Sequence, residues 1–352
     1  MSDILSRALA LRDLTDPAAG EHAIQHIVAA LENALATTWG VPVRRDPGPR
    51  VVSVADNYDR LRYSAEAVTR DRRYSRYLDD GTMLRSHTTA RIPALLRSVT
   101  DDDMLLSVPG ICYRRDAIDR QHVGEPHQLD LWRVHRRGTP LDGGDLQEMV
   151  RLVVEAVLPD RPWWTVPSRH PYTLDGREIY VDGVEIGECG LSHPDLTAGG
   201  LAMGLGLDRL VMLVKGIDDI RLLRSADPRV ASQMRDLAPY RPVSTMPPVR
   251  RDLSLAVDGE ADVEVLGDRV RELLGPGASA VEEVTVLAET RYADLPAAAR
   301  DRIGVRPGQK NVLLRVVLRD LERTLTAADA NVLRDRIYAG LHEGAAAEWA
   351  SR

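Results

Sequence analysis

With 352 residues, the chain is long enough to form two domains, each around its own hydrophobic core. Hydrophobic residues make up 44% and charged residues 28% of the chain, and no apolar run approaches the roughly 20 residues that span a bilayer, which excludes a membrane protein or a membrane partner. The net charge of −7 excludes a protein whose whole surface attracts polyanions, although it still allows a local basic groove.

Residues 1–50 are predicted to form an N-terminal helical segment. Acidic residues lie among the apolar ones in residues 1–22, unlike a signal or transit peptide, and the chain has only two cysteines, so we expect a cytoplasmic protein. The stretch "EHAIQHIVAALENALATTWG" (21–40) has apolar residues at helical spacing and ends on glycine, which predicts an amphipathic helix. Further on, "PRVVSVADNYDRL" predicts a short strand and a turn, and Pro93 interrupts the helical spacing of residues 83–99.

A series of strands is predicted from about residue 105 onward. The stretches "MLLSVPGICYRR", "HQLDLWRVHR", "REIYVDGVEIGECGLS" and "LAMGLGLDRLVMLV" alternate strands with glycine turns, and "GDLQEMVRLVVEAVLP" is a helix among them. Strands joined by loops, without regular β–α alternation, favour an antiparallel sheet flanked by helices in an α+β fold. We expect this domain to occupy residues 51–235, followed by a proline-marked linker at 236–246.

A second, smaller domain is predicted over residues 247–345. It reads as the strand "RRDLSLAV", the helix "DVEVLGDRVRELLG", the strands "VEEVTVLAETRYA" and "NVLLRVVLRD", and the helix "TAADANVLRDRIYAGLHEG". This β-α-β-β-α order is the ferredoxin-like pattern, so we expect an α/β sandwich at the C-terminal end.

Two charged motifs could bind an anionic ligand. In "YRRDAIDRQH" (113–122), an arginine at a strand end can form a bidentate fork to phosphate or carboxylate, although a surface hairpin with ordinary ion pairs explains the motif equally well. In "GLGLDRL" (204–210), two glycines allow a strand and a helix to pass closely, and Arg209 begins the helix. The second motif lacks the third glycine of a dinucleotide fingerprint, and no GxxxxGK[ST] phosphate loop occurs in the chain.

Taken together, "YRRD…H…HQLD", "EIGECGLSHPDL" and "GLGLDRLVMLVKGIDDIRLLRSADPR" resemble the catalytic core of a class II aminoacyl-tRNA synthetase, and more narrowly the phenylalanyl-tRNA synthetase family. "MLRSHTTA" is similar to that family's Leu-Arg-Thr-His-Thr-Ser segment, and "PPVRRDLSLAV" with "LRDLERTLTAADAN" resembles its ferredoxin-fold anticodon-binding domain. The resemblance covers about residues 50–340 and is closest in layout to the single-chain organellar enzymes. It implies a ligase that uses ATP and Mg²⁺ to form an aminoacyl-adenylate and charges tRNA, with tRNA(Phe) as the expected partner, as a monomer or homodimer.

The resemblance also implies roles for individual residues. Arg114 would bridge the ATP α-phosphate and the amino-acid carboxylate, Asp116 would lie near the adenine amino group, and His122 near the pyrophosphate. Arg209 would meet the γ-phosphate, and Pro126 stands at the position that stacks on adenine. The other implied contacts are those to the amino acid, from His87, Thr89, Gln128, Asp130, His170 and Tyr172, and those to Mg²⁺, from Glu185 and Glu188.

The chain departs from the family pattern around both substrates. Pro126 replaces a phenylalanine, Asp130 replaces a glutamate, and Ile92 replaces a glutamine. His170 and Tyr172 replace the two rings of the family's Phe-Pro-Phe segment. A buried donor left unpaired by an apolar ligand costs about 1–3 kcal/mol, which favours a polar, for example hydroxylated, aromatic analogue over phenylalanine. Both amino acids stay open as substrates, because the two polar groups could instead point outward.

Other readings stay open at the level of sequence. The chain could instead activate an amino acid for a non-tRNA acceptor, or bind tRNA without catalysis. It contains no phenylalanine, which reflects either codon bias or a synthetase made while charged tRNA(Phe) is scarce. Ordinary structural roles are expected for a final group of residues: His135 and His193, the pair Asp219 and Arg221, Cys189 in the core, and Trp163 with Trp164 at a sheet edge.

Overall fold

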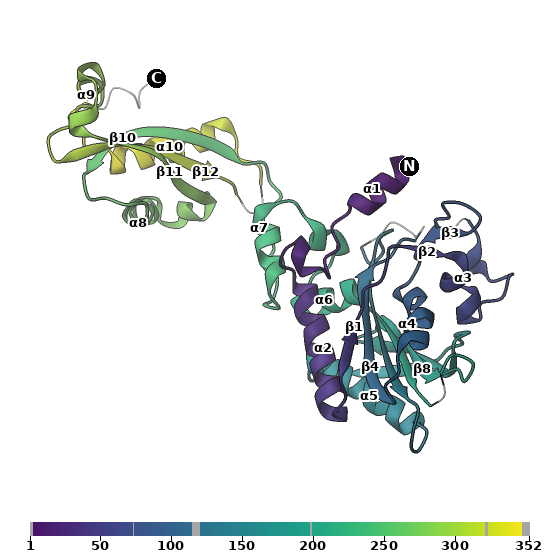
Figure 1. Cartoon of the computed structure of the whole chain (residues 1–352). Coiled ribbons are helices and arrows are strands. Elements are labelled where there is room, and N and C mark those ends of the chain that lie inside the picture. Colours follow the sequence, from purple (N-terminus) through teal and green to yellow (C-terminus); the bar gives the residue numbers. More distant parts are fainter. Residues whose placement is uncertain (1–2, 73, 115–119, 198, 321–322, 347–352) are drawn as a thin grey trace. The chain divides into compact units, whose positions relative to one another are not determined.

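The computed structural model describes residues 3–72, 74–114, 120–197, 199–320 and 323–346 (Figure 1). The chain divides into two compact units, residues 1–241 and residues 242–352. Among the described residues, no helix is both long and apolar enough to cross a membrane.

The first unit contains a seven-stranded sheet within its described residues, in the order β1-β4-β5-β9-β8-β7-β6. Every neighbouring pair is antiparallel except β1 and β4, which are parallel. The strands are β1 (Val43–Arg45), β4 (Asp103–Ile111), β5 (His127–His135), β6 (Trp163–Pro167), β7 (Thr173–Val181), β8 (Val184–Ser192) and β9 (Leu201–Gly206). The predicted antiparallel sheet flanked by helices is therefore confirmed, with the parallel strand β1 as an addition.

Helices cover both faces of this sheet near β4, where α2 and α4 lie on opposite sides (Figure 1). The predicted helix at 21–40 is observed as α2, which His22 caps at its start and Gly40, with a left-handed backbone, ends. The strands β2 and β3 form a separate two-stranded antiparallel sheet. The remaining elements of the unit are α1 (Asp3–Ala10), α2 (Ala23–Trp39), β2 (Val51–Ser53), α3 (Val54–Asn57), β3 (Thr82–Leu84), α4 (Ile92–Ser98), α5 (Gly143–Val157), α6 (Leu207–Lys215) and α7 (Pro228–Ala231).

Pro93 does not interrupt a helix, which corrects the prediction for residues 83–99. It lies in the first turn of α4 (Ile92–Ser98), where a missing N–H costs no hydrogen bond. The residues before it form β3 and then a short 3₁₀ turn at Thr88–Arg91. This change from strand to tight turn brings Thr88 and Thr89 to Asp130 of β5.

The second unit has a three-stranded antiparallel sheet in its described residues, ordered β10-β12-β11. Its elements follow the predicted β-α-β-β-α order, with one additional helix, α9. They are β10 (Val249–Asp258), α8 (Val263–Leu274), β11 (Val281–Arg291), α9 (Ala297–Ile303), β12 (Gln309–Leu318) and α10 (Ala327–Leu341).

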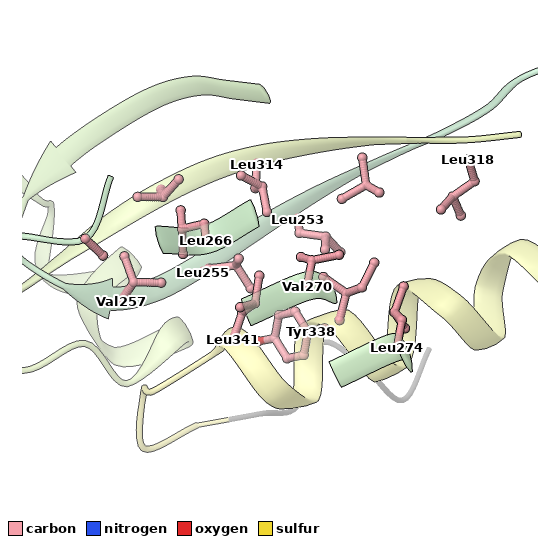
Figure 2. Packing of buried hydrophobic residues seen from close by; sticks show 14 of the residues in the cluster. Leu253, Leu255, Val257, Leu266, Val270, Leu274, Leu314, Leu318, Tyr338 and Leu341 are labelled. Carbon is pink, nitrogen blue, oxygen red and sulfur yellow. The ribbon is translucent and has the colours of Figure 1, made fainter. Parts of the chain in front are cut away.

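The core of this unit follows directly from sequence periodicity. Alternate residues of the central strand β12 face the two helices, as do alternate residues of β10, and α8 contributes residues four apart (Figure 2). Leu253 pairs across the strands with Leu314, and both are fully buried. These four elements contribute the following buried residues to the core: Leu253, Leu255 and Val257 of β10, Leu266, Val270 and Leu274 of α8, Val312, Leu314, Val316 and Leu318 of β12, and Ala330, Ile337, Tyr338 and Leu341 of α10.

We expect Leu314→Ala to lower the free energy of unfolding of the second unit by about 2–5 kcal/mol, because it leaves a cavity at the centre of a packed core. Leu287→Ala is the matched control, since Leu287 lies on β11 of the same sheet with 41% of its surface exposed. Hydrogen exchange of β10 and β12 peptides in the full chain measures the change. Equal effects of the two substitutions would contradict this description of the core.

Candidate active site

A cavity of the first unit lies over three adjacent strands of its sheet, β5, β9 and β8. Its volume is about 520 Å³. Gln128 and Asp130 of β5 pair in register with Gly206 and Gly204 of β9, and Gly204 in turn pairs with Glu188 of β8. All five residues line the cavity. The two glycines form its floor, because they carry no side chain between the polar groups on either side.

An irregularity in β8 places two glutamates on this one face. Residues three apart in a regular strand point to opposite faces. Here Tyr180 of β7 lies opposite Glu185 and the next residue, Ile179, lies opposite Gly187, so β8 carries one extra residue. This bulge offsets the alternation, and as a result both Glu185 and Glu188 line the cavity.

Arg114 and Arg209 line this same cavity although they are 95 residues apart in the chain. Arg114 donates from Nε to the carbonyl oxygen of Ser86 at 2.7 Å, and its two Nη atoms donate to no residue that the structure describes. Arg209, in the first turn of α6, donates from Nη1 to the Glu185 carboxylate at 2.7 Å and to the Glu185 carbonyl at 2.9 Å. Its Nη2 lies 3.1 Å from Nε2 of His122. The site therefore presents two guanidinium groups to one ligand-sized space.

A buried hydrogen-bonded pair, His127 and Asp208, fixes where α6 begins relative to β5. His127 Nδ1 lies 3.0 Å from Oδ1 of Asp208, and the His127 backbone N–H donates to Oδ2 of the same carboxylate at 2.5 Å. Burial opposes ionisation of Asp208, but the charge and hydrogen bonds of His127 hold its pKa below the ordinary value. Arg209 directly follows Asp208, so this pair positions the arginine at the cavity. The pair was not singled out from the sequence, although both residues flank predicted site residues.

The residues predicted to hold the amino and carboxyl groups of an amino acid gather around Asp130. Thr88 and Thr89 donate to its Oδ2 at 2.6 and 3.1 Å, and Trp132 Nε1 donates to its Oδ1 at 3.1 Å. Burial outweighs these bonds and raises the pKa of Asp130 to about 6. The Oε1 atom of Gln128 is buried and accepts no hydrogen bond from the described part of the chain.

His87 lies at the same end of the cavity. Both of its ring nitrogens are buried and have no hydrogen-bond partner among the described residues, and its ring stacks on Tyr63 at 5.9 Å. Burial, and next the charge of Arg114, lower the pKa of His87 to about 3, so the imidazole is neutral. Tyr58 and Tyr63 also line the cavity. The sequence offered no sign of these two tyrosines, since they come from a turn that only the tertiary fold brings there.

His170 and Tyr172 meet at Glu188. His170 Nε2 lies 3.0 Å from Oε2 of Glu188, and the Tyr172 hydroxyl donates to Oε1. Tyr172 lines the cavity, whereas His170 stands behind Glu188. The two polar groups therefore point inward, toward the acid, rather than outward. Burial opposes the charge on Glu188, but the hydrogen bond and charge of His170 and the bond from Tyr172 hold its pKa below the ordinary value.

The last two predicted site residues are Pro126 and Asp116. Pro126 also lines the cavity. Asp116 lies outside the described residues. The structure thus brings all of the predicted residues that it describes to the cavity or, in the case of His170, directly behind it.

None of the residues expected to have ordinary structural roles lines the cavity. His135 lies 3.0 Å from Asp103, Asp219 accepts from Arg221 Nε at 2.8 Å, and Cys189 is buried. Trp164 lies on the edge strand β6, where its ring stacks on Tyr180 at 5.8 Å. No group of three or more His, Cys, Asp or Glu residues that could hold a metal ion occurs in the ranges described.

Comparison with known proteins gives a consistent picture. The family model described as "tRNA synthetases class II core domain (F)" matches residues 11–234. A Drosophila melanogaster protein named "Probable phenylalanine--tRNA ligase, mitochondrial" is 25% identical over 355 residues, covering 82% of this chain and 74% of that protein. The chloroplastic/mitochondrial phenylalanine--tRNA ligase of Arabidopsis thaliana is 27% identical over 310 residues, covering 82% and 68%. The phenylalanine--tRNA ligase alpha subunit of Gloeobacter violaceus is 29% identical over 211 residues, covering 53% and 61%.

Proposed function

The chain belongs to the family of class II tRNA synthetases, and we propose that it is a ligase of the phenylalanyl type, which activates an amino acid with ATP and transfers it to tRNA. The observation that carries this proposal is the convergence of Arg114 and Arg209 on one cavity that also contains Gln128 and Asp130. Cationic forks for phosphate and acceptors for an ammonium group thus face a common space.

The proposed chemistry needs no protein nucleophile. The amino-acid carboxylate attacks the α-phosphorus of ATP, the bond to pyrophosphate breaks, and an aminoacyl-adenylate forms. A hydroxyl group of the tRNA then attacks the acyl carbon and releases AMP. Arg114, with both Nη atoms directed to no described residue, stabilises the charge that develops on the α-phosphate, while Arg209 and His122 hold the pyrophosphate end.

At the amino-acid end, Asp130 and Gln128 accept from the α-ammonium group, and His87 stands beside the carboxylate. Thr89 acts through Asp130, to which it donates a hydrogen bond. We propose that Asp116 and the flat face of Pro126 contact adenine.

Glu185 fits a role in holding Mg²⁺. Its carboxylate lies beside the arginine proposed for the γ-phosphate, and Mg²⁺ in nucleotide sites is bound by one or two carboxylates together with phosphate oxygens. When bound, the ion neutralises charge on the phosphates. Glu188 fits this role less well, since its carboxylate pairs with His170 and Tyr172 and not with an arginine proposed for phosphate.

We propose that the second unit is a ferredoxin-like anticodon-binding domain. Its β-α-β-β-α order, its strand order β10-β12-β11 and the hydrophobic core that β10 and β12 share with α8 and α10 support this assignment. The catalytic domain then spans residues 51–235 after an N-terminal helical segment, the linker spans 236–246, and the anticodon-binding domain spans 247–345. A tRNA, with tRNA(Phe) as the first candidate, would contact both units.

For the assembly and the compartment we keep the predictions of a monomer or homodimer in the cytoplasm. Mass measurement in solution and subcellular fractionation test them.

The direct test is amino-acid-dependent exchange of pyrophosphate into ATP, followed by charging of purified tRNA(Phe). Exchange together with charging supports the proposal. Exchange without charging of any tRNA would favour a paralogue that loads another acceptor. Absence of exchange with every amino acid, combined with tRNA binding, would favour a non-catalytic tRNA-binding protein.

A pH profile tests the assignment of Asp130. Its pKa is raised to about 6, so the carboxylate loses its charge as the pH falls through that value and no longer attracts the α-ammonium group. We expect the KM for the amino acid to rise about tenfold from about pH 7 to about pH 5, with a smaller change in the KM for ATP. Asp130→Asn, which has no charge to lose, should show a high KM at every pH. A wild-type KM that stays constant over this range would contradict the assignment.

A further inference from the structure

The end of the cavity beyond the proposed ammonium site is built around one carboxylate, that of Glu188. The Glu188 side chain is 39% accessible. Because its strand β8 has neighbours on both sides in the sheet and the residue lines the cavity, this accessible surface faces the cavity. Its two partners are buried: the side chain of His170 is 10% exposed, and Tyr172 is 5% exposed. Glu188 is thus an acid held from behind and open toward the ligand space.

Glu188 has acceptor capacity left over. A carboxylate has about four lone-pair positions, and His170 and Tyr172 occupy two of them. Both partners come from the same short segment before β7, so they hold the carboxylate in one orientation. A ligand group that covers the remaining positions must donate hydrogen bonds to Glu188, or it leaves a charged acceptor unpaired and shielded from water.

Aromatic rings form the walls beside this acid. The ring of Tyr63 lies 5.9 Å from that of His87 and 6.3 Å from that of Tyr172. Behind Tyr172, the fully buried Trp132 stacks on it at 6.0 Å and closes the space beyond Asp130. Flat faces of this kind suit a planar side chain, and the carboxylate of Glu188 stands at the far end of that space.

The spacing of the strands gives the direction in which such a ligand lies. Asp130 and Glu188 both pair with Gly204, one from each side, so their backbones are two strand spacings apart, about 10 Å. An aromatic amino acid whose ammonium group meets Asp130 reaches across the glycine floor, and the end of its side chain comes to Glu188.

We infer that Glu188 is the specificity-determining residue of this site, and that it selects an amino acid with a planar side chain ending in a hydrogen-bond donor, such as a phenolic hydroxyl, over one ending in a bare phenyl ring. The inference rests on the proposed function and names its substrate class. It also separates Glu188 from Glu185, which alone of the two acids pairs with a phosphate-binding arginine.

The test uses the full chain in pyrophosphate exchange with L-phenylalanine, L-tyrosine and L-meta-tyrosine. We expect one of the hydroxylated amino acids to exceed phenylalanine in kcat/KM by about tenfold to a hundredfold, the range for one hydrogen bond to a charged group, mainly through KM. Glu188→Gln should remove most of this preference. Glu178→Gln is the matched control. Glu178 lies opposite Glu188 on β7 and accepts hydrogen bonds from two hydroxyl groups, but it does not line the cavity. The preference for a hydroxylated amino acid should therefore persist in this variant.

A second variant guards against a loss of folding in Glu188→Gln. Tyr172→Phe keeps the ring and frees one more acceptor position on Glu188, so it should keep or strengthen the preference for a donor. Phenylalanine as the best substrate of the wild type, or a preference for the hydroxylated amino acid that survives Glu188→Gln, would overturn the inference while leaving the proposed function standing.

Two further outcomes are also decisive. If Glu188→Gln raises the Mg²⁺ concentration needed for exchange equally with all three amino acids, Glu188 is a metal ligand and the inference is overturned. If no amino acid of a complete natural and hydroxylated panel supports exchange by the wild type, the proposed function itself fails, and the inference fails with it.

Discussion

Arg114→Ala is expected to lower the rate of amino-acid-dependent pyrophosphate exchange by about a hundredfold to a thousandfold, the usual effect of removing one group that stabilises developing charge. Arg114 is fixed through Nε by the carbonyl oxygen of Ser86, which leaves its two Nη atoms for the ligand. A fork held in place before the ligand arrives loses little entropy when it binds, so its removal should affect kcat more than the KM for either substrate.

Two further variants make this result specific. Arg114→Lys keeps the positive charge but loses the planar fork, and we expect it to recover only a small part of the rate. Arg91→Ala is the control, because Arg91 directly follows the segment "MLRSHTTA" that contains Ser86, and it pairs with Asp46 at 2.7 Å but does not line the cavity. Near-normal exchange by Arg114→Ala would mean that the α-phosphate lies elsewhere, and the proposed arrangement of ATP would have to be abandoned.

The parts of the fold that were predictable from the sequence are those in which one face of an element is buried along its whole length. The alternate apolar residues of β10 and β12 and the helical spacing of α2 and α8 each specify one buried face. The strand β4 is mostly apolar, and its residues from Met104 to Ile111 are buried on both faces. Patterns of this kind depend only on local spacing, so they can be recognised without knowing which elements pack against them.

The short edge strands β1 and β6 were not predicted. β1 has three residues and β6 has five, too few for a period to be visible, and what makes them strands is pairing with β4 and β7. The prediction for Pro93 was wrong for a related reason. A proline can interrupt a helix or stand in its first turn, and here the 3₁₀ turn before it shows that the helix begins at this point.

At the site, motifs predicted which residues gather but not how they are arranged. Arg114, Gln128 and Arg209 stand in motifs that a resemblance can locate. The grouping of Glu188 with His170 and Tyr172 depends instead on the bulge in β8 and on the register of β7 with β8, which no local pattern specifies. Because of the same bulge, Glu185 and Glu188 share a face although they are three residues apart, and we propose different roles for them.

Gly204 is the residue at which the fold and the proposed chemistry can be separated most cleanly. A side chain added there would point into the cavity, since the nearest atoms to its Cβ are Cγ and Oε1 of Glu188, at 3.7 and 3.9 Å. These are ordinary contacts, so Gly204→Val should fold, and the added methyl groups should occupy the space between Asp130 and Glu188 where we place the amino acid. We expect amino-acid-dependent exchange to fall by more than a thousandfold, about 4 kcal/mol, with little change in thermal stability.

Gly187, on the neighbouring strand, provides the contrast. A Cβ at this position would lie 2.1 Å from the carbonyl oxygen of Gly204, a backbone atom that cannot move aside, so Gly187→Val should lose stability as well as activity. Gly204→Ala, with a single methyl group, should raise the KM for the amino acid and leave the KM for ATP nearly unchanged. Thermal unfolding and exchange measured on the same preparations distinguish the three variants. Normal amino-acid activation by a folded Gly204→Val protein would show that the substrate does not lie over the glycine floor.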